Sequence, residues 1–204
     1  MSIPFANDIS AEVSKALVSF TADDTPTNPV DPTDPDNPGT GPGTGTAGPL
    51  SIDYVPELAF GSQKITGKIE TYSTTNKTPY VQVTDKRGTG AGYSVSAKLS
   101  NFQVGADTTK ILKDARLDFN NSEMATISSN GAAAPTAKDK FTLSANGDAV
   151  EVLKAEKNQG MGTWIERWLS SADANENIKL TVNTANALSE AYEGTIDWTI
   201  GVTP

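Results

Sequence analysis

The side chains that could do chemistry in this chain are mainly carboxylates and hydroxyls, because the sequence contains no histidine and no cysteine. Histidine is the usual general base near neutral pH, so its absence excludes Ser-His-Asp triads and histidine-ligated metal sites. The absence of cysteine excludes disulfides, thiolate nucleophiles and sulfur-ligated metals. Two catalytic arrangements remain: a pair of carboxylates, as in glycosidases, or a serine activated by a lysine.

Three acidic residues are candidates for a carboxylate pair, namely Asp114, Asp118 and Glu166. They lie at polar positions in the alternation of predicted strands, where a side chain usually faces solvent. No neighbouring residue marks any of them as buried beside apolar groups, which a raised catalytic pKa would need. We therefore expect these carboxylates to be exposed, and we predict that the protein is not an enzyme and uses no metal or cofactor.

Two further patterns imitate ligand sites. The glycine-rich run Gly88–Gly92 looks like a dinucleotide loop, but it precedes a strand instead of opening a helix, so it lacks the phosphate-binding geometry. A glycine-rich hairpin is the better prediction. The acidic run Asp31–Asn37 could be imagined as a calcium loop, but the glycine turn and bidentate glutamate of an EF-hand are missing. We expect a solvated linker there.

Tryptophan is the residue type that stands out, because Trp164, Trp168 and Trp198 all fall in the last 41 residues. A tryptophan either packs in a core or is exposed as a stacking surface for sugars or an anchor for a partner. Trp164 and Trp168 are four residues apart, so on one strand they would share a face. We expect one of these two to be an exposed platform. Trp198 lies in the apolar alternation Ile196-x-Trp198-x-Ile200, which predicts a core position.

Short runs of β-branched and aromatic residues fill the chain from residue 50 onward, separated by glycine, asparagine and proline. This pattern predicts an all-β fold: a single β-sandwich or barrel-like domain of short strands with at most a short helix, over Ala185–Tyr192. The predicted strands are Leu50–Val55, Lys64–Glu70, Tyr80–Thr84, Tyr93–Leu99, Ala115–Phe119, Met124–Ile127, Phe141–Leu143, Ala149–Leu153, Trp164–Leu169, Ile178–Val182 and Thr195–Val202.

The N-terminal quarter of the chain has a different composition. Residues 26–48 are rich in proline, glycine and aspartate, which predicts a solvated linker without regular structure. This linker separates an N-terminal segment, residues 1–25, from the β domain, residues 49–204. In the N-terminal segment, Lys15–Thr21 alternates well enough for one strand, although the apolar residues from Ile9 to Phe20 fit a helix face about as well.

Charge and hydropathy limit the partners and the location. The chain carries 25 acidic and 16 basic residues, a net charge of −9. Seven acids and one base lie in residues 1–48, so residues 49–204 carry a net charge of only −3. No basic patch is present, which argues against nucleic acid or anionic lipid as the main partner.

No segment is apolar enough for direct membrane insertion. Met1–Asn7 lacks the apolar core of a signal peptide, so we interpret the chain as a processed or recombinant form.

Four stretches of the sequence resemble the WxL domain family of Gram-positive surface proteins, and they span nearly the whole chain. GPLSIDYVPELAFGSQKI, from Gly48, is similar to the opening segment of the family, and VQVTDKRGTGAGYSVSAKL, from Val81, is similar to its first signature. GMGTWIERWL, from Gly160, resembles the glycine-rich approach to a tryptophan, and YEGTIDWTIGVTP, from Tyr192, resembles the C-terminal signature.

The two Trp-x-Leu triplets of the family occur here in altered form, as Tyr93-Ser94-Val95 and Trp198-Thr199-Ile200. Each triplet keeps an aromatic residue followed two positions later by an aliphatic one on the same strand face. We expect the strands that carry them to be neighbours, because a repeated motif is most simply explained by one shared site or core layer.

The resemblance implies a secreted protein of the Gram-positive cell surface that attaches non-covalently to the cell wall by binding peptidoglycan. As an alternative it implies a structural subunit of a surface complex, bound to a membrane-anchored WxL-interacting protein. In either case the residues expected to bind the ligand or partner are Tyr93, Val95, Trp164, Trp168, Trp198 and Ile200.

Overall fold

Fourteen strands and one turn of 3-10 helix, Thr184–Asn186, make up the regular structure of residues 12–202, the part of the chain that this computed structural model describes. Met1–Asn7, the segment interpreted above as a processed N-terminus, lies outside these residues. The strands are β1 (Leu50–Tyr54), β2 (Ile69–Thr74), β3 (Tyr80–Asp85), β4 (Tyr93–Leu99), β5 (Phe102–Val104), β6 (Asp107–Leu112), β7 (Arg116–Phe119), β8 (Glu123–Thr126), β9 (Thr136–Ala137), β10 (Phe141–Ser144), β11 (Val150–Ala155), β12 (Gly162–Arg167), β13 (Asn175–Asn183) and β14 (Ile196–Gly201).

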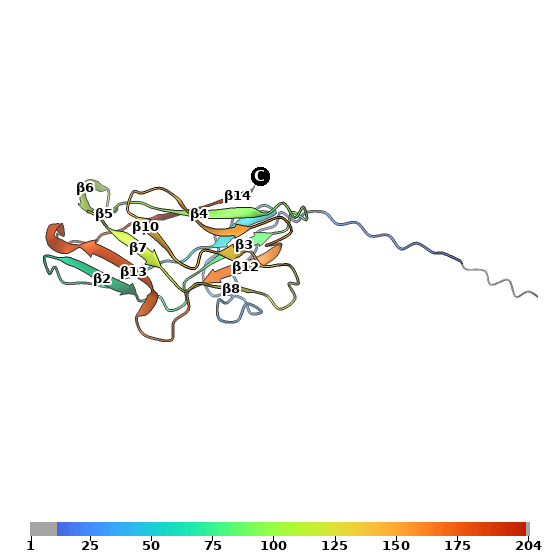
Figure 1. Cartoon of the computed structure of the whole chain (residues 1–204), viewed down its shortest axis with the longest axis horizontal. Helices are drawn as coiled ribbons and strands as arrows, with labels where there is room; N and C mark the ends of the chain where they lie inside the picture. Colours follow the sequence, from blue (N-terminus) through green and yellow to red (C-terminus); the bar gives the residue numbers. More distant parts are fainter. Residues whose placement is uncertain (1–11, 203–204) are drawn as a thin grey trace, which may run out of the picture.

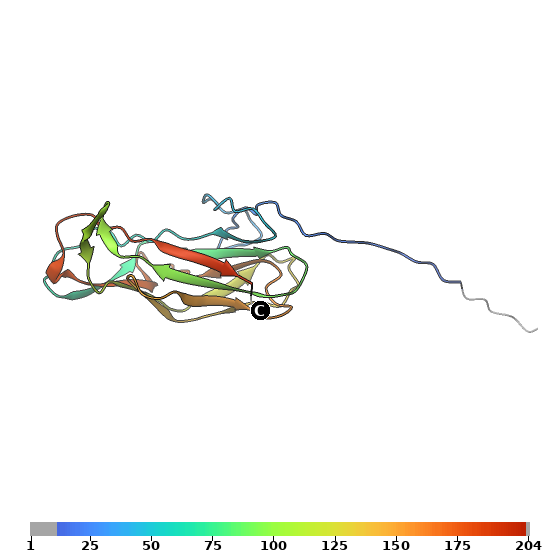
Figure 2. The ribbon, with the colours of Figure 1, turned by 90° about the horizontal axis from the view of Figure 1, so that it is seen from above.

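These strands form three four-stranded sheets and one hairpin, and every pairing between named strands is antiparallel. The sheet orders are β1-β3-β12-β8, β10-β7-β13-β2 and β14-β4-β11-β9, and the hairpin is β5-β6. The body is elongated, and residues 12–22 extend from one of its ends (Figures 1 and 2). The prediction of an all-β fold is confirmed, and no α-helix interrupts the strands within residues 12–202.

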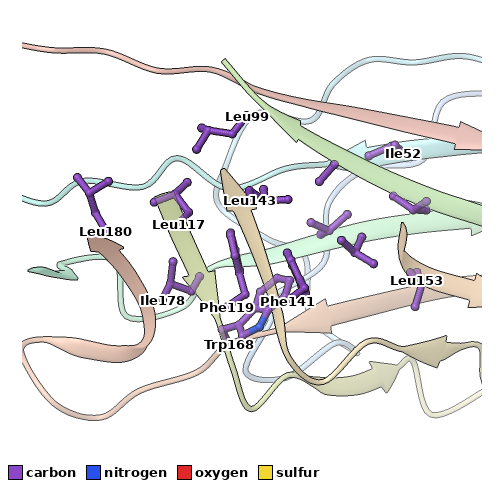
Figure 3. Packing of buried hydrophobic residues seen from close by; sticks show 14 of the residues in the cluster. Ile52, Leu99, Leu117, Phe119, Phe141, Leu143, Leu153, Trp168, Ile178 and Leu180 are labelled. Carbon is purple, nitrogen blue, oxygen red and sulfur yellow. The ribbon is translucent and has the colours of Figure 1, made fainter. Parts of the chain in front are cut away.

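One apolar core lies among the three large sheets, because each of them contributes buried side chains to it: β1 and β3 from the first, β7, β10 and β13 from the second, and β4 and β11 from the third. Its largest aromatic group is Trp168, whose ring centroid lies 5.2 Å from that of Phe119 and 6.2 Å from that of Phe141 (Figure 3). Phe119 and Phe141 stack on each other at 4.6 Å. This aromatic cluster joins the end of β12 to the sheet that contains β7 and β10.

The outward face of the β1-β3-β12-β8 sheet is polar, and its centre is the buried carboxylate of Asp53. This carboxylate accepts hydrogen bonds from Ser51 Oγ and Thr84 Oγ1, both at 2.6 Å, and from Gln82 Nε2 at 3.0 Å. Burial raises the pKa of Asp53, while these three hydrogen bonds oppose that shift. A polar group that is removed from water needs such partners, so this face requires a cover that also supplies hydrogen bonds.

Residues 23–48, called the strap below, provide that cover. The amide of Val30 donates to Gln82 Oε1 at 2.8 Å, and Gln82 Nε2 also donates to the carbonyl of Asn28 at 3.0 Å. Further along, Arg167 donates to the carbonyl of Pro32 at 2.6 Å. These contacts fix the strap across β3 and β12.

The expectation of a freely solvated linker over residues 26–48 was therefore wrong in one respect. The segment contains no named strand, as expected, and many of its side chains are exposed, but Pro29 is buried and the backbone is held by the sheet. At Gly41 an added Cβ would lie 2.8 Å from the ring of Tyr54, so glycine allows the strap to lie flat against that ring. Composition does not reveal such contacts because their partners lie far away in sequence.

Residues 12–22, called the tail below, form neither the strand nor the helix considered for this segment. They are extended and unpaired within the described chain, and they point away from the body (Figures 1 and 2). The tail ends at residue 22, next to the point where the strap is attached to the body. There the carboxylate of Asp23 forms a 2.8 Å ion pair with Lys86.

Strand positions were predicted well where apolar and polar residues alternate, and less well elsewhere. Tyr93–Leu99 was predicted to the residue, whereas the strand expected at Lys64–Glu70 is β2, which begins only at Ile69. The β5-β6 hairpin was missed because the first half of β6 is polar and exposed. No helix within residues 12–202 is long and apolar enough to cross a membrane.

If the amide of Gln82 fastens the strap, Gln82→Ala should remove one of the three donors to Asp53 and leave the amide of Val30 without its partner. Loss of buried hydrogen bonds of this kind costs about 1–3 kcal/mol, which urea unfolding should measure. Protease cleavage within residues 26–48 should also become faster. Gln63→Ala, which removes one exposed amide, is the control. Equal stability of the two variants would contradict the role of Gln82.

Candidate functional site

The two altered triplets lie on neighbouring strands, as expected. β14 pairs with β4 in antiparallel register, and this register places Ile200 opposite Val95 and Trp198 opposite Ala97. Side chains that pair in this way share one face of the sheet. The two aliphatic residues of the triplets therefore lie side by side, although 105 positions separate them in the sequence.

The first triplet is entirely a packing element. Tyr93 and Val95 are completely buried, and the Tyr93 hydroxyl has no hydrogen-bond partner within the described residues. Burial raises the pKa of Tyr93 far above its ordinary value. Gly160, at φ +72°, lies so close that an added Cβ would be 2.7 Å from the Tyr93 ring. The glycine-rich stretch before β12 is thus needed to close over this ring.

The loop from Lys86 to Gly92 connects two different sheets, because β3 and β4 do not pair with each other. The expected glycine-rich hairpin was therefore wrong. Arg87 holds the loop through a 2.7 Å ion pair with Asp85 and a 2.8 Å hydrogen bond to the carbonyl of Gly92. Gly88, Gly90 and Gly92 all have positive φ, so they supply the reversal that carries the chain from one sheet to the other.

Trp164 and Trp168 do not form an exposed platform, contrary to our expectation. Trp164 is only 6% exposed, and its indole N–H donates to the carbonyl of Met161 at 2.9 Å. Trp168 is fully buried in the aromatic cluster described above. The expectation that both share one strand face was also wrong, because β12 ends at Arg167 and Trp168 lies beyond it.

Trp198 is the tryptophan that solvent reaches. It and Ile200 are half-buried because β14 is the outer strand of its sheet, with β4 as its one partner. The expected core position was thus only partly right: the alternation of β14 is real, but the apolar side is left incompletely covered. Of the three tryptophans, Trp198 has the most exposed side chain.

A groove of about 390 Å³ runs beside β14 at Trp198. Residues 55–60, which follow β1, form its second wall, and no backbone hydrogen bond joins them to β14 in the described chain. Most of the residues that line the groove are apolar, and two acidic residues, Glu57 and Glu193, also line it. Its apolar lining includes Leu58, Phe60, Phe102, Ile196 and Trp198. We call it the edge groove.

A second hollow, of about 520 Å³, lies on the outer face of the β1-β3-β12-β8 sheet, beside the start of the strap. Thr27 and Asn28 of the strap form one wall, and Thr84, Thr163 and the loop around Ser129 form the other. Seven of its ten lining residues carry a hydroxyl, amide or ammonium group, and Pro26, Ile127 and Gly162 complete the lining. We call it the strap cleft. Sequence reasoning missed it because the strap was expected to be free of the domain.

Glu166, which we expected to be exposed, is 1% exposed on β12. Burial raises its pKa to about 8, and the nearby hydroxyl of Ser122 acts in the opposite direction. Asp114 is exposed as predicted, and Asp118 is half-buried and bonded to Thr142 at 2.6 Å. The expectation was wrong because Glu166 lies opposite Val81, on the face of the sheet that contributes to the core and not on the solvent side.

The buried carboxylates do not form a catalytic pair. Glu166 lies opposite Val81 on the inner face of the sheet, whereas Asp53 bonds to Gln82 and Thr84, whose side chains point to the outer face. A glycosidase pair needs two carboxyl groups that face one space. Within residues 12–202, no cluster of three or more acidic residues is arranged to hold a metal ion.

The different burial of the tryptophans predicts different costs of truncation. Trp168→Ala should reduce the free energy of unfolding by about 3–5 kcal/mol, because it empties part of the core. Trp198→Ala should cost less than half of that, since solvent already reaches this side chain. Urea unfolding of the two variants measures the difference. A larger loss for Trp198→Ala would show that the edge strand, not the aromatic cluster, dominates stability.

The raised pKa of Glu166 predicts that stability falls as pH rises from about 4.5 to about 8. The unfolded carboxyl ionises near its ordinary value of 4.5, whereas the folded one keeps its proton until about pH 8, so ionisation favours unfolding in this interval and levels off above it. Glu166→Gln should flatten this slope and stabilise the protein at pH 8. Glu151→Gln, at an exposed position of β11, is the control. An unchanged slope in Glu166→Gln would contradict the assignment.

Comparison with known proteins supplies one match. No curated protein and no solved structure matches the chain. A family model described as "WxL domain surface cell wall-binding" matches residues 8–204, nearly the whole length. The matched range includes the strap, both triplets, the glycine-rich loop and the edge strand, so the elements that build the two hollows are those of one family. The chain belongs to the WxL family of surface cell wall-binding domains.

Proposed function

We propose that this domain is part of a secreted Gram-positive surface protein, attaches non-covalently to peptidoglycan, and binds the glycan in the strap cleft. The observation that carries the proposal is the chemistry of that cleft. Sugars present many hydroxyl and amide groups, so they are bound by convergent side chains with the same hydrogen-bonding groups.

The strap cleft offers such groups on both walls. Asn28 and Ser129 are exposed there, and neither side chain has a hydrogen-bond partner within the described residues. Thr84 and Thr163 are bonded to each other at 2.9 Å, which fixes the floor of the cleft. Lys86 holds the strap at this point through its bonds to Asp23 and to the carbonyl of Thr25. The floor of the cleft and the attachment of the strap are therefore pre-organised, whereas the side chains of Asn28 and Ser129 are free to bond to a ligand.

The side chains of Asn28 and Ser129 allow a direct test. The double variant Asn28→Ala/Ser129→Ala should reduce retention on purified peptidoglycan by about tenfold, because it removes two hydrogen bonds of about 0.5–1.5 kcal/mol each. Stability should be unchanged, as both side chains are exposed. Ser171→Ala/Asn186→Ala changes the same residue types at exposed positions elsewhere.

Retention should be measured in both mild and high salt. Binding through neutral hydroxyls and amides should persist in high salt, whereas binding through charges should weaken as the Debye length falls. Full retention by Asn28→Ala/Ser129→Ala, or retention that disappears in high salt, would contradict glycan binding in the strap cleft.

A second candidate function is supported by the edge groove: this domain is a structural subunit that binds a surface protein, such as a membrane-anchored WxL-interacting protein. An unpaired strand edge beside an apolar groove suits an extended polypeptide, because main-chain hydrogen bonds and side-chain pockets are offered together. Trp198 and Ile200 would contact the partner directly. The other four residues expected at the site would not contact the partner and would only stabilise the strands by packing: Tyr93, Val95, Trp164 and Trp168.

A further inference from the structure

The tail carries an unusual number of exposed apolar side chains. Val13, Leu17, Val18 and Phe20 are 88%, 93%, 79% and 90% exposed, and they are half of the large exposed apolar side chains within residues 12–202. Exposure of so much apolar surface is unfavourable and marks an interaction site. No backbone hydrogen bond reaches residues 12–22 from the rest of the described chain. The tail is thus an extended segment without a partner.

In extended backbone, Ala16, Val18 and Phe20 point to one side of the tail, and Val13, Lys15 and Leu17 point to the other. From Ala16 to Phe20 the first side is apolar throughout, as in a strand that covers one apolar surface. A strand of this kind needs an acceptor with unpaired backbone groups and an apolar lining.

The edge groove is such an acceptor. β14 has an unpaired outer edge, and the groove beside it is lined by Leu58, Phe60 and Trp198. A strand placed there would extend the sheet beyond β14 and bury its apolar side chains against these residues. It would also cover the half-exposed Trp198.

Charge favours this pairing. Glu57 and Glu193 lie on the groove, and neither forms an ion pair within the described residues. Lys15 is the sole basic residue of positions 1–63. With Val18 and Phe20 turned into the groove, Lys15 would point outward toward its acidic rim.

The occupant is the tail of a second copy. The tail is fastened at Lys86, which follows β3, and leaves the body at the end where β14 finishes (Figures 1 and 2). Folding back along its own β14 would make it run parallel to that strand, whereas every named strand pair in the domain is antiparallel. The tail of another copy has no such restriction.

We propose that residues 13–20 of one copy add as a strand to β14 of the next copy, so that the domain assembles head to tail. One tail and one groove per copy make the contact heterologous, which produces open chains. This deepens the second candidate function, because it names the partner of the edge groove. It does not depend on binding in the strap cleft.

The test compares the full chain with two variants by sedimentation over a wide range of concentration, in the absence of cell wall. The tail variant is Val18→Asp/Phe20→Asp, and the groove variant is Glu57→Lys/Glu193→Lys. The full chain should form oligomers whose mass increases with concentration. Each variant should dissociate at least about tenfold more readily. Thr40→Asp/Thr46→Asp adds the same charge as the tail variant at exposed strap positions and should still assemble.

Sedimentation of a mixture of the two variants is the decisive measurement. The tail variant keeps an intact groove and the groove variant keeps an intact tail, so a one-to-one mixture should form dimers and nothing larger. Such dimers would also show that both variants fold. A monomeric full chain at all concentrations, unchanged assembly of the tail variant, or a mixture without dimers would overturn the proposal. A peptidoglycan pulldown of the tail variant remains a separate readout for the strap cleft.

Discussion

The constraint on which most of this structure depends is that β14 pairs on one side only. Its register with β4 places Ile200 beside Val95, so the C-terminal strand is fixed by the buried strand of the first triplet. Its other edge has no partner, and Trp198 is left half-covered. The two triplets therefore have different roles: the first anchors the sheet from within, and the second presents an aromatic side chain and free backbone groups at the surface. This also explains why Tyr93 can replace a tryptophan, since its position requires an aromatic ring that fits beneath Gly160.

The second constraint is the polar outer face of the β1-β3-β12-β8 sheet. The buried carboxylate of Asp53 is bonded by side chains of its own sheet, and the amide of Gln82, which is one of them, finds its remaining partners only in the strap. The strap thereby becomes part of the domain, and its first residues form one wall of the cleft that we propose for glycan. The range matched by the family model begins before the strap, which agrees with this view. The surfaces proposed for the cell wall and for a partner thus share no lining residue.

The fold class followed from the sequence because alternation and turn residues are local signals, and Tyr93–Leu99 shows how well they work in a strand covered on one side. The failures have a common cause, which is contact between residues distant in sequence. The strap resembles a linker because Gln82 and Arg167, its partners, lie far along the chain. Glu166 occupies a position that alternation assigns to solvent, but it lies on the face of its sheet that contributes to the core. The tryptophans were misjudged because the sequence does not show that Trp168 lies beyond the end of β12, in the core, or that β14, which carries Trp198, is an edge strand.

The central claim, that β14 is an open edge, is tested most directly by residue-resolved amide hydrogen exchange. The Val18→Asp/Phe20→Asp chain should be used, so that no tail occupies the groove. In an antiparallel edge strand, alternate amides bond to the neighbour and the others face outward. Along Ile196–Gly201, protection should therefore alternate between slow exchange and exchange as fast as in loops, while all central amides of β4 remain protected. Uniform protection of β14 equal to that of β4 would contradict the account, because it would mean that both edges of β14 are already paired.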